Sequence, residues 1–318
     1  MFNRRLISFI GIFFSIGLFI WLLIKSDFTI VYKSLSSLPI SLFIILFLLQ
    51  ILTVLLIGIQ WNILFKAGKI TITLKNTLMM NFIGTFFESI TPAMKSGGEG
   101  FKLLYLKKLN ITLAQSTPIL LSQKVVSFSC FILLTLFGLV GTLTTLSQTI
   151  QTTTFIGILL IVIFIIGLLI TGMIMVKKTG QNNFISTFKD TLSLIVFELK
   201  KHKIQFTILV LISFSIWILF ALKFLLITQQ FNLSLSISEI ASLTYIPYTI
   251  GLLPLSPGGL GTFEATMTYL LSPLFTTYTE ALTITLIFRF FSHWLVFILA
   301  GMSFIVQSLS TLRGEKHV

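Results

Sequence analysis

Long runs of apolar residues that contain no charge dominate this chain. A helix that crosses the hydrocarbon core of a bilayer, which is about 30 Å thick, needs about 20 such residues. Five runs meet this requirement: Leu6–Ile24, Leu38–Ile59, Val125–Leu146, Thr154–Val176 and Ile204–Leu222. A sixth, at about Ala281–Val306, has similar length but contains Arg289 and His293. The pattern predicts an all-α, polytopic integral membrane protein with about six spanning helices.

Two further apolar stretches, Asn76–Met94 and Ile240–Leu271, are interrupted by proline and glycine. Lysine and arginine accumulate on the cytoplasmic side of membrane proteins. Lys75 precedes the first stretch and Lys107 and Lys108 follow it, so both of its ends belong on that side. We therefore expect residues 76–110 to form a re-entrant hairpin that turns at residues 91–98.

By the same rule for lysine and arginine, residues 240–279 start and end outside, with their turn at Pro254–Gly261. The positions of the charged residues leave open whether this hairpin stops at mid-depth or reaches the far face of the membrane. The first run follows Arg4 and Arg5 and has no small-residue cleavage site, so it reads as an uncleaved helix rather than a signal peptide. This orientation puts both termini in the cytoplasm, with the plasma membrane as the expected location, and puts Lys223 on the outer face.

The order of span, span, hairpin and span therefore occurs twice with opposite topology. The two tips are also similar, because Gly97-Gly98-Glu99-Gly100 and Gly258-Gly259-Leu260-Gly261 share a GGxG pattern. Inverted repeats with broken helices are typical of secondary transporters, which bind substrate at the repeat interface. We expect one membrane domain, residues 1–318, built from inverted repeats 1–149 and 150–312. A chance coincidence of helix-breaking residues is the open alternative.

Composition agrees with the pattern of runs. The chain is 55% hydrophobic and only 10% charged, whereas soluble domains carry about 25% charged residues. The net charge of +13 does not indicate a nucleic-acid partner, because the basic residues flank apolar runs and face anionic headgroups instead. Cys130 is the single cysteine and there are three histidines, so we expect neither a disulfide framework, nor a metal site, nor a cofactor.

The hairpin tips are the candidate binding site. Irregular backbone at membrane depth is tolerated where it lines a polar cavity or is buried in protein. The half-helix after each tip points free N–H groups at the turn, which favours an anion, and the glycines allow its close approach. The phosphate of a phospholipid or a polyprenyl carrier is the expected ligand. The predicted anion-binding residues are Lys95, Gly97, Gly98, Glu99, Lys102, Pro257, Gly258, Gly259, Gly261, Glu264 and Arg289.

The charged residues among these also have structural interpretations. Glu99 and Glu264 have the spacing of a capping-box glutamate behind Ser96 and Gly261, so helix capping alone would explain them. Arg289 lies too deep in its span to reach water, so it should pair with one of these glutamates or with a substrate anion. Lys102 is placed for an ordinary helical pair with Glu99, three residues before it.

Three other basic residues have mainly structural interpretations. Lys95, beside the first tip, and Lys124, at the start of its span, fit snorkelling lysines. A lone histidine in a span, such as His293, is more often a satisfied core donor than a ligand.

These residues resemble a known family. Pro257 through Gly261, followed by Glu264, Arg289 and Gly301, is similar to the C-terminal signature of the lysylphosphatidylglycerol synthase transmembrane (flippase-like) family. The segment from Thr91 and Pro92 to Lys102 resembles its other motif. The resemblance covers nearly the whole chain and implies lipid translocation or lipid handling, a role assigned to only some members.

The chain also departs from the family pattern. The family often has arginine where Lys95 and Lys102 stand, and an acidic-basic pair with a later aspartate where this chain has Gln123, Lys124 and Ser127. Longer members continue into a soluble aminoacyl-transfer domain. This chain ends at Val318, so we expect no such activity.

The leading hypothesis is a protein that flips an anionic lipid or lipid-linked precursor between leaflets and is not an enzyme. One alternative is an intramembrane enzyme that acts on a lipid phosphate, with Glu99 or Glu264 as general base, although no acidic pair for a divalent ion accompanies them. The other is a scaffold for a separately encoded enzyme. Homo-oligomerisation stays open.

Overall fold

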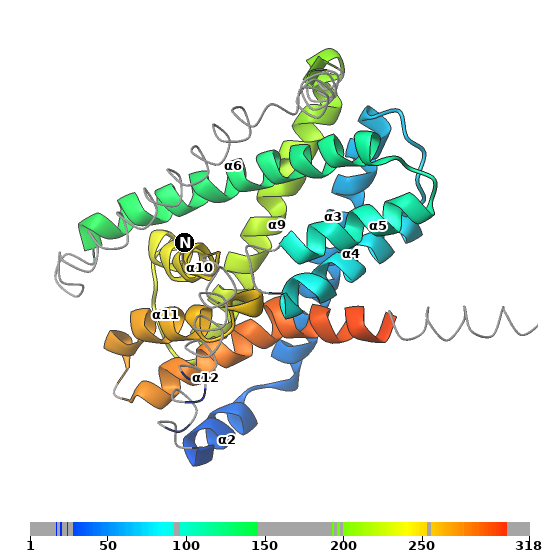
Figure 1. Ribbon diagram of the computed structural model, residues 1–318. Coiled ribbons are helices and arrows are strands. Elements are labelled where there is room, and N and C mark those ends of the chain that lie inside the picture. The colour runs from blue at the N-terminus through cyan, green and yellow to red at the C-terminus, as the bar shows by residue number, and fades with distance from the viewer. Residues whose placement is uncertain are drawn as a thin grey trace, which may run out of the picture.

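The computed structural model describes residues 28–91, 96–145, 200–252, 256–275 and 277–303, with a few isolated residues outside these ranges (Figure 1). This part of the chain contains nine α-helices and no strand. The predicted spans Leu6–Ile24 and Thr154–Val176 lie outside it, apart from three isolated residues of the first. For the remainder, the all-α prediction is confirmed.

Four long helices form the frame of the molecule: α3 (Ile40–Ala67), α6 (Leu113–Thr145), α9 (Lys203–Gln230) and α12 (Tyr278–Arg289). The last continues through a π-helical turn, Phe290–Trp294, as far as Ser303. Each contains a segment long and apolar enough to cross a membrane: Ile40–Ala67, Gln115–Val140, Lys203–Gln230 and Tyr278–Ser303. Four of the six predicted spans are therefore confirmed as such helices. A short helix, α2 (Phe28–Ser37), precedes them.

The first interrupted stretch folds as two helices, α4 (Leu74–Ile90) and α5 (Ser96–Lys108), which pack against each other. The side chain of Thr73 caps α4 by accepting a hydrogen bond from the backbone N–H of Asn76. The helix ends at Thr91, whose backbone is extended (φ −98°, ψ 129°). Pro92 explains this ending, because a residue before proline is disfavoured in helical conformation.

The second interrupted stretch also folds as a helical pair, α10 (Ile237–Gly251) and α11 (Thr262–Leu271). Ser236 and Glu239 form a capping box at the start of α10. Between the helices, Pro257–Gly259 form a short 3₁₀ turn. Gly258, Gly259 and Gly261 have φ of 58°, 74° and 82°, a left-handed conformation that favours glycine.

The two halves pack into each other. α3 lies against α9, and α6 from the first half lies against α10 from the second (Figure 1). The described helices thus follow the same order twice: a long helix, a broken hairpin and a second long helix.

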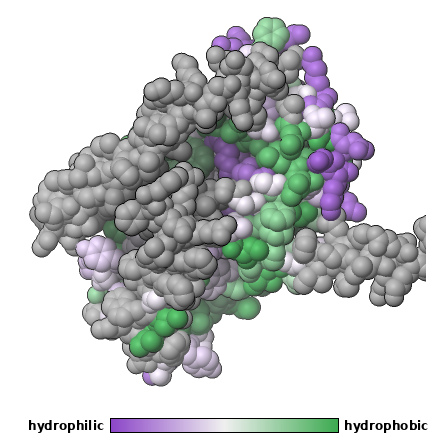
Figure 2. Space-filling model, in the orientation of Figure 1, coloured by the Kyte–Doolittle hydropathy of each residue, from purple (hydrophilic) through white to green (hydrophobic). Residues whose placement is uncertain are grey.

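The outer surface of the long helices is apolar, and several of their polar residues lie inside. In α3, Leu48, Leu52, Leu55 and Ile59 are exposed, whereas Gln50, Thr53 and Gln60 are buried. Figure 2 shows hydrophobic side chains around a recessed hydrophilic area. This distribution is the reverse of a soluble protein and fits contact with lipid tails.

Exposed lysines gather at one end of the molecule, where the α3–α4 and α5–α6 connections lie (Figures 1 and 2). They are Lys66, Lys69, Lys75, Lys107 and Lys108.

Lys223 is not among these exposed lysines. Its predicted place on the outer face is wrong, because α9 continues past it to Gln230 and its side chain is fully buried.

Candidate functional site

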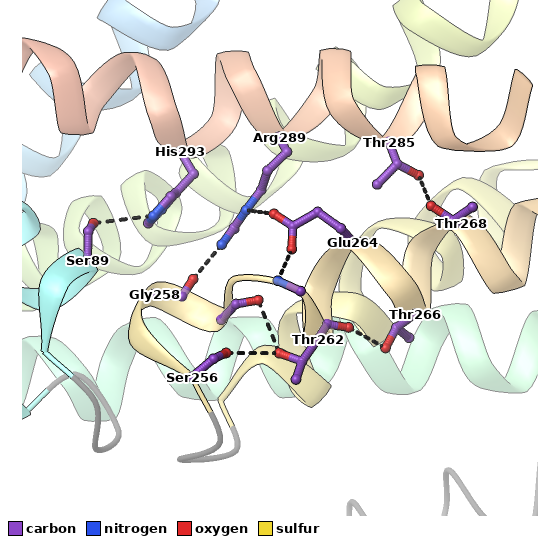
Figure 3. A network of polar contacts seen from close by, with 12 residues as sticks. Ser89, Ser256, Gly258, Thr262, Glu264, Thr266, Thr268, Thr285, Arg289 and His293 are labelled. Atoms are coloured by element: carbon purple, nitrogen blue, oxygen red, sulfur yellow. Dashed lines mark hydrogen bonds and ion pairs between the residues drawn. The ribbon is translucent and has the colours of Figure 1, made fainter. Parts of the chain in front are cut away.

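The second hairpin tip is organised around a buried ion pair. Arg289 Nε donates to Glu264 Oε1 at 3.0 Å, and the two side chains are only 4% and 0% exposed (Figure 3). The other oxygen of Glu264 accepts the backbone N–H of Gly261 at 2.6 Å. Glu264 therefore caps α11 and neutralises Arg289 with one carboxylate. Of the two glutamates considered from sequence, Glu264 is the partner of Arg289.

Arg289 also holds the turn itself. Its terminal nitrogen donates to the carbonyl oxygen of Gly258, and its guanidinium lies 4.4 Å from the centre of the Phe263 ring. The π-helical turn begins immediately after Arg289, a type of helix irregularity found frequently at functional sites.

The first hairpin tip carries a second group of charges. Glu99 Oε1 accepts from Lys102 Nζ at 2.8 Å and lies 3.1 Å from Lys124 Nζ. The helical pair between Glu99 and Lys102 is confirmed. The snorkelling interpretation of Lys124 is wrong, because α6 turns this side chain inward against Glu99. Lys95 lies outside the described residues.

Most of the tip glycines are packed against the protein itself. A Cβ at Gly98 would lie 2.5 Å from the carbonyl oxygen of Gly84, and one at Gly97 would collide with Thr91. A Cβ at Gly259 would lie 3.2 Å from the carbonyl oxygen of Gly251. At these three positions the expectation that glycine opens the backbone to an anion is wrong, because helices and turns of the same chain fill the space.

The two tips meet. The turn of the second hairpin packs against the end of α4, where a Cβ on Gly258 would lie 3.3 Å from the backbone of Ser89. Ser89 Oγ and His293 Nε2 are 3.2 Å apart and form a hydrogen bond between the halves (Figure 3). His293 thus joins α12 to the first hairpin.

A cavity of about 230 Å³ lies at this junction and is lined by both halves. Its basic groups are Lys102, Lys124 and Arg289, and Glu88 and His293 also line it. The remaining polar residues that line the cavity include Gln50, Thr53, Gln60, Asn81, Gln123 and Ser292. The aromatic residues that line it are Trp61, Phe128, Phe131, Trp217, Phe220, Tyr248 and Phe263. Among the described residues, no group of three or more His, Cys, Asp or Glu side chains is placed to hold a metal ion. The cavity offers cations, amides and aromatic faces, which together suit an anionic group with an apolar remainder.

Comparison with known proteins agrees with the motifs. A family model described as the lysylphosphatidylglycerol synthase TM region matches residues 8–300. The chain belongs to this family. Its similar relatives include a UPF0104 membrane protein of Methanocaldococcus jannaschii, 25% identical with 83% of this chain and 84% of the relative covered. UPF0104 membrane proteins of Methanothermobacter thermautotrophicus (24% identical; 78% and 80% covered) and Pyrococcus horikoshii (20%; 94% and 96%) are similar too.

This member of the lysylphosphatidylglycerol synthase TM-region family is therefore a multi-pass membrane protein. Of its predicted site residues, the structure brings Lys102, Gly258 and Arg289 to one cavity, with Glu99 and Glu264 paired behind the basic side chains. Pro257 starts the second turn.

Sequence reasoning missed part of this site. Gln50 and Thr53 occur at helical spacing within the run Leu38–Ile59, which was treated as uniformly apolar, and Gln60 directly follows that run. Together they were a usable signal for an inward polar face. Gln60 donates to Ser213 on α9 at 2.6 Å and accepts from Gln123 on α6 at 3.1 Å. No comparable signal marked Lys124, because its partner lies on another helix.

Proposed function

We propose that this protein binds the headgroup of an anionic lipid in the cavity between its two hairpin tips and moves that lipid between leaflets. The observation that carries the proposal is the meeting of the tips at one cavity lined by Lys102, Lys124 and Arg289. The family's name, which refers to a phospholipid synthase, supports a lipid as the ligand.

The charge arrangement suits reversible binding. Buried cations are costly unless paired, and Glu99 and Glu264 supply that pairing in the absence of ligand. A phosphate that enters the cavity can accept hydrogen bonds from the same basic side chains without leaving any of them unpaired. The basic side chains are therefore paired both with and without the headgroup, which lowers the cost of both entry and release.

The surface supports a lipid with its tails outside the protein. Apolar side chains such as Leu52 and Ile59 cover the outer face of α3, so acyl or polyprenyl chains can stay in the bilayer. Only the polar headgroup has to pass through the cavity.

The proposed topology follows from the ends of the hairpins. We place the lysine-rich α3–α4 and α5–α6 connections in the cytoplasm, by the positive-inside rule. The α4–α5 hairpin then enters from the cytoplasm and the α10–α11 hairpin from the opposite side. This makes the halves inverted repeats with their interface at the cavity, the arrangement of many secondary transporters. Both termini would be cytoplasmic and the plasma membrane the site of action.

Reconstitution into liposomes tests the function. Headgroup-labelled phosphatidylglycerol and a labelled polyprenyl phosphate are supplied in separate arms, because both present a phosphate. We expect the wild type to accelerate exchange of one of them between leaflets, and Lys124→Gln and Arg289→Lys to reduce it. Arg289→Lys keeps the charge but removes the planar fork that reaches both Glu264 and Gly258. Lys108→Gln, at an exposed position outside the cavity, is the matched control and should exchange lipid like the wild type.

The same samples distinguish the alternatives. Equal exchange rates in the wild type, Lys124→Gln and Arg289→Lys would mean that the cavity is not the lipid site. A covalently altered lipid in the extracts would instead support the intramembrane enzyme. Binding without exchange, together with a co-purifying enzyme, would support the scaffold.

A further inference from the structure

Lys223 is buried in the middle of the protein and has no carboxylate partner among the described residues. Its side chain is 0% exposed. Its Nζ donates to Gln50 Oε1 on α3 and lies 4.2 Å from the centre of the Phe220 ring. The carboxylates of Glu99 and Glu264 pair with Lys102, Lys124 and Arg289 instead.

This environment is unusual for a lysine. An ammonium group has three donors, and one amide oxygen and one aromatic face satisfy it only in part. A charged group inside a membrane protein is expensive and usually marks a pathway or a partner. The basic side chains at the cavity have carboxylate partners, since Lys102 and Lys124 share Glu99 and Arg289 pairs with Glu264. Lys223 has none among the described residues, so it most needs an anion from outside the chain.

Lys223 lies directly behind the cavity wall. Gln50 and Phe220, the two side chains that contact its ammonium group, both line the cavity. These two side chains therefore separate the ammonium group from the space in the cavity.

The polar face of α3 connects this end of the cavity with the other cations. Gln50, Thr53 and Gln60 all line it, and ten residues of helix correspond to about 15 Å. At the far end of this face, Gln60 accepts a hydrogen bond from Gln123, the neighbour of Lys124 in sequence. The centre of the Trp61 ring there lies 5.3 Å from Lys102 Nζ. Basic groups therefore lie at both ends of one polar stripe, with Lys102 and Lys124 in the cavity and Lys223 behind its wall.

We propose that Lys223, with Gln50 and Phe220, forms a second binding point for the phosphate of the anionic lipid, separate from the one at Lys102 and Lys124. This inference rests on the proposed function of the cavity. A headgroup that moves along α3 leaves one set of cations and reaches Lys223, where its charge supplies the missing counter-ion. A zwitterionic headgroup brings its own ammonium group and gains less, so this point selects lipids with a net negative headgroup.

Photo-labelling tests the location of the second point without requiring transport. The probe is phosphatidylglycerol with a diazirine on its headgroup, and phosphatidylcholine with the same group is the control lipid. Labelled peptides of the purified full chain are mapped by mass spectrometry. We expect the phosphatidylglycerol probe to label two regions of the wild type, one near Lys102 and Lys124 and one at Phe220–Phe224. In Lys223→Met, labelling of the second region should fall about ten-fold, since hydrogen bonds to charged groups are the strong ones, while the first region stays labelled.

The matched control is Lys203→Met, the same substitution at an exposed position of the same helix, which should label like the wild type. Methionine has a similar shape and removes a buried charge, so Lys223→Met should melt at or above the wild-type temperature. A merely structural lysine would give unchanged labelling in that folded variant. Gln50→Leu removes the amide of the proposed binding point, so it should lower labelling of the same region. Unchanged labelling in this variant would exclude Gln50 from the binding point.

Exchange in liposomes is measured in parallel to separate the two proposals. A wild type that exchanges lipid but is never labelled at Phe220–Phe224, with Lys223→Met equally active, would overturn the second binding point. A wild type labelled there, with the label lost in Lys223→Met but with no exchange, would confirm the binding point and overturn the transport function.

Discussion

The carboxylate of Glu264 serves two structural purposes at once. One oxygen accepts the backbone N–H of Gly261 and so caps the N-terminus of α11, and the other pairs with Arg289. Because the pair is almost completely buried, removal of either partner leaves a charge without compensation. Breaking a buried pair in this way is much more costly than never having had it.

We expect Glu264→Gln and Arg289→Met each to destabilise the protein, by about 3–5 kcal/mol if the remaining charge stays buried. The double variant should lose clearly less than the sum of the two, because it buries no unpaired charge. Melting temperatures of the purified variants in detergent measure this. Strictly additive losses would show that the two side chains are not energetically coupled.

The α4–α5 hairpin depends on close backbone contact between its two helices. Gly98 on α5 lies over Gly84 on α4, and a side chain on Gly84 would collide with the stem of Lys102. The glycines of the first tip therefore determine how near α5 approaches α4 and, through it, where Lys102 enters the cavity. This packing role differs from the anion approach expected from sequence.

Alanine substitutions separate this role from helix propensity. Gly98→Ala should destabilise the hairpin by about 1–3 kcal/mol, the usual cost of overpacking, because its Cβ would meet the Gly84 carbonyl oxygen at 2.5 Å. Gly100→Ala in the same helix meets nothing within 4 Å, so it should stabilise the helix by up to about 1 kcal/mol. Thermal unfolding in detergent compares the two, and equal melting temperatures would rule out close α4–α5 contact.

The two hairpins meet end to end between four long helices, which places a polar cavity inside an apolar exterior. This arrangement predicts on which side of the membrane each helix connection lies. The α3–α4 and α5–α6 connections should lie on one side of the membrane and the α9–α10 connection on the other.

Single cysteines test this in a Cys130→Ala background, since Cys130 is the one native cysteine and is buried. Lys69→Cys, Lys108→Cys and Ser234→Cys all use exposed positions in these connections. In intact cells, an impermeant maleimide should label Ser234→Cys alone, and the other two should react only after permeabilisation. Labelling of Lys69→Cys and Lys108→Cys from opposite sides would mean that the α4–α5 hairpin crosses the membrane.

The sequence by itself determined the features that depend on neighbours along the chain. Apolar runs predicted the four described spans because a helix in lipid needs continuous apolar length. The break at Thr91 follows from the proline after it, and the turn at Gly258–Gly261 from residues that tolerate left-handed backbone. The spacing of Gly261 and Glu264 likewise predicted the cap that starts α11.

Tertiary structure alone decided which charges meet and which residues face the cavity. Nothing along the chain favoured Glu264 over Glu99 as the partner of Arg289, or directed Lys124 to Glu99. Lys223 ended an apolar run and so resembled a helix end, yet α3 packs against α9 and buries it beside Gln50. Such contacts join helices far apart in sequence, and their geometry is set by how those helices pack, which short-range patterns do not encode.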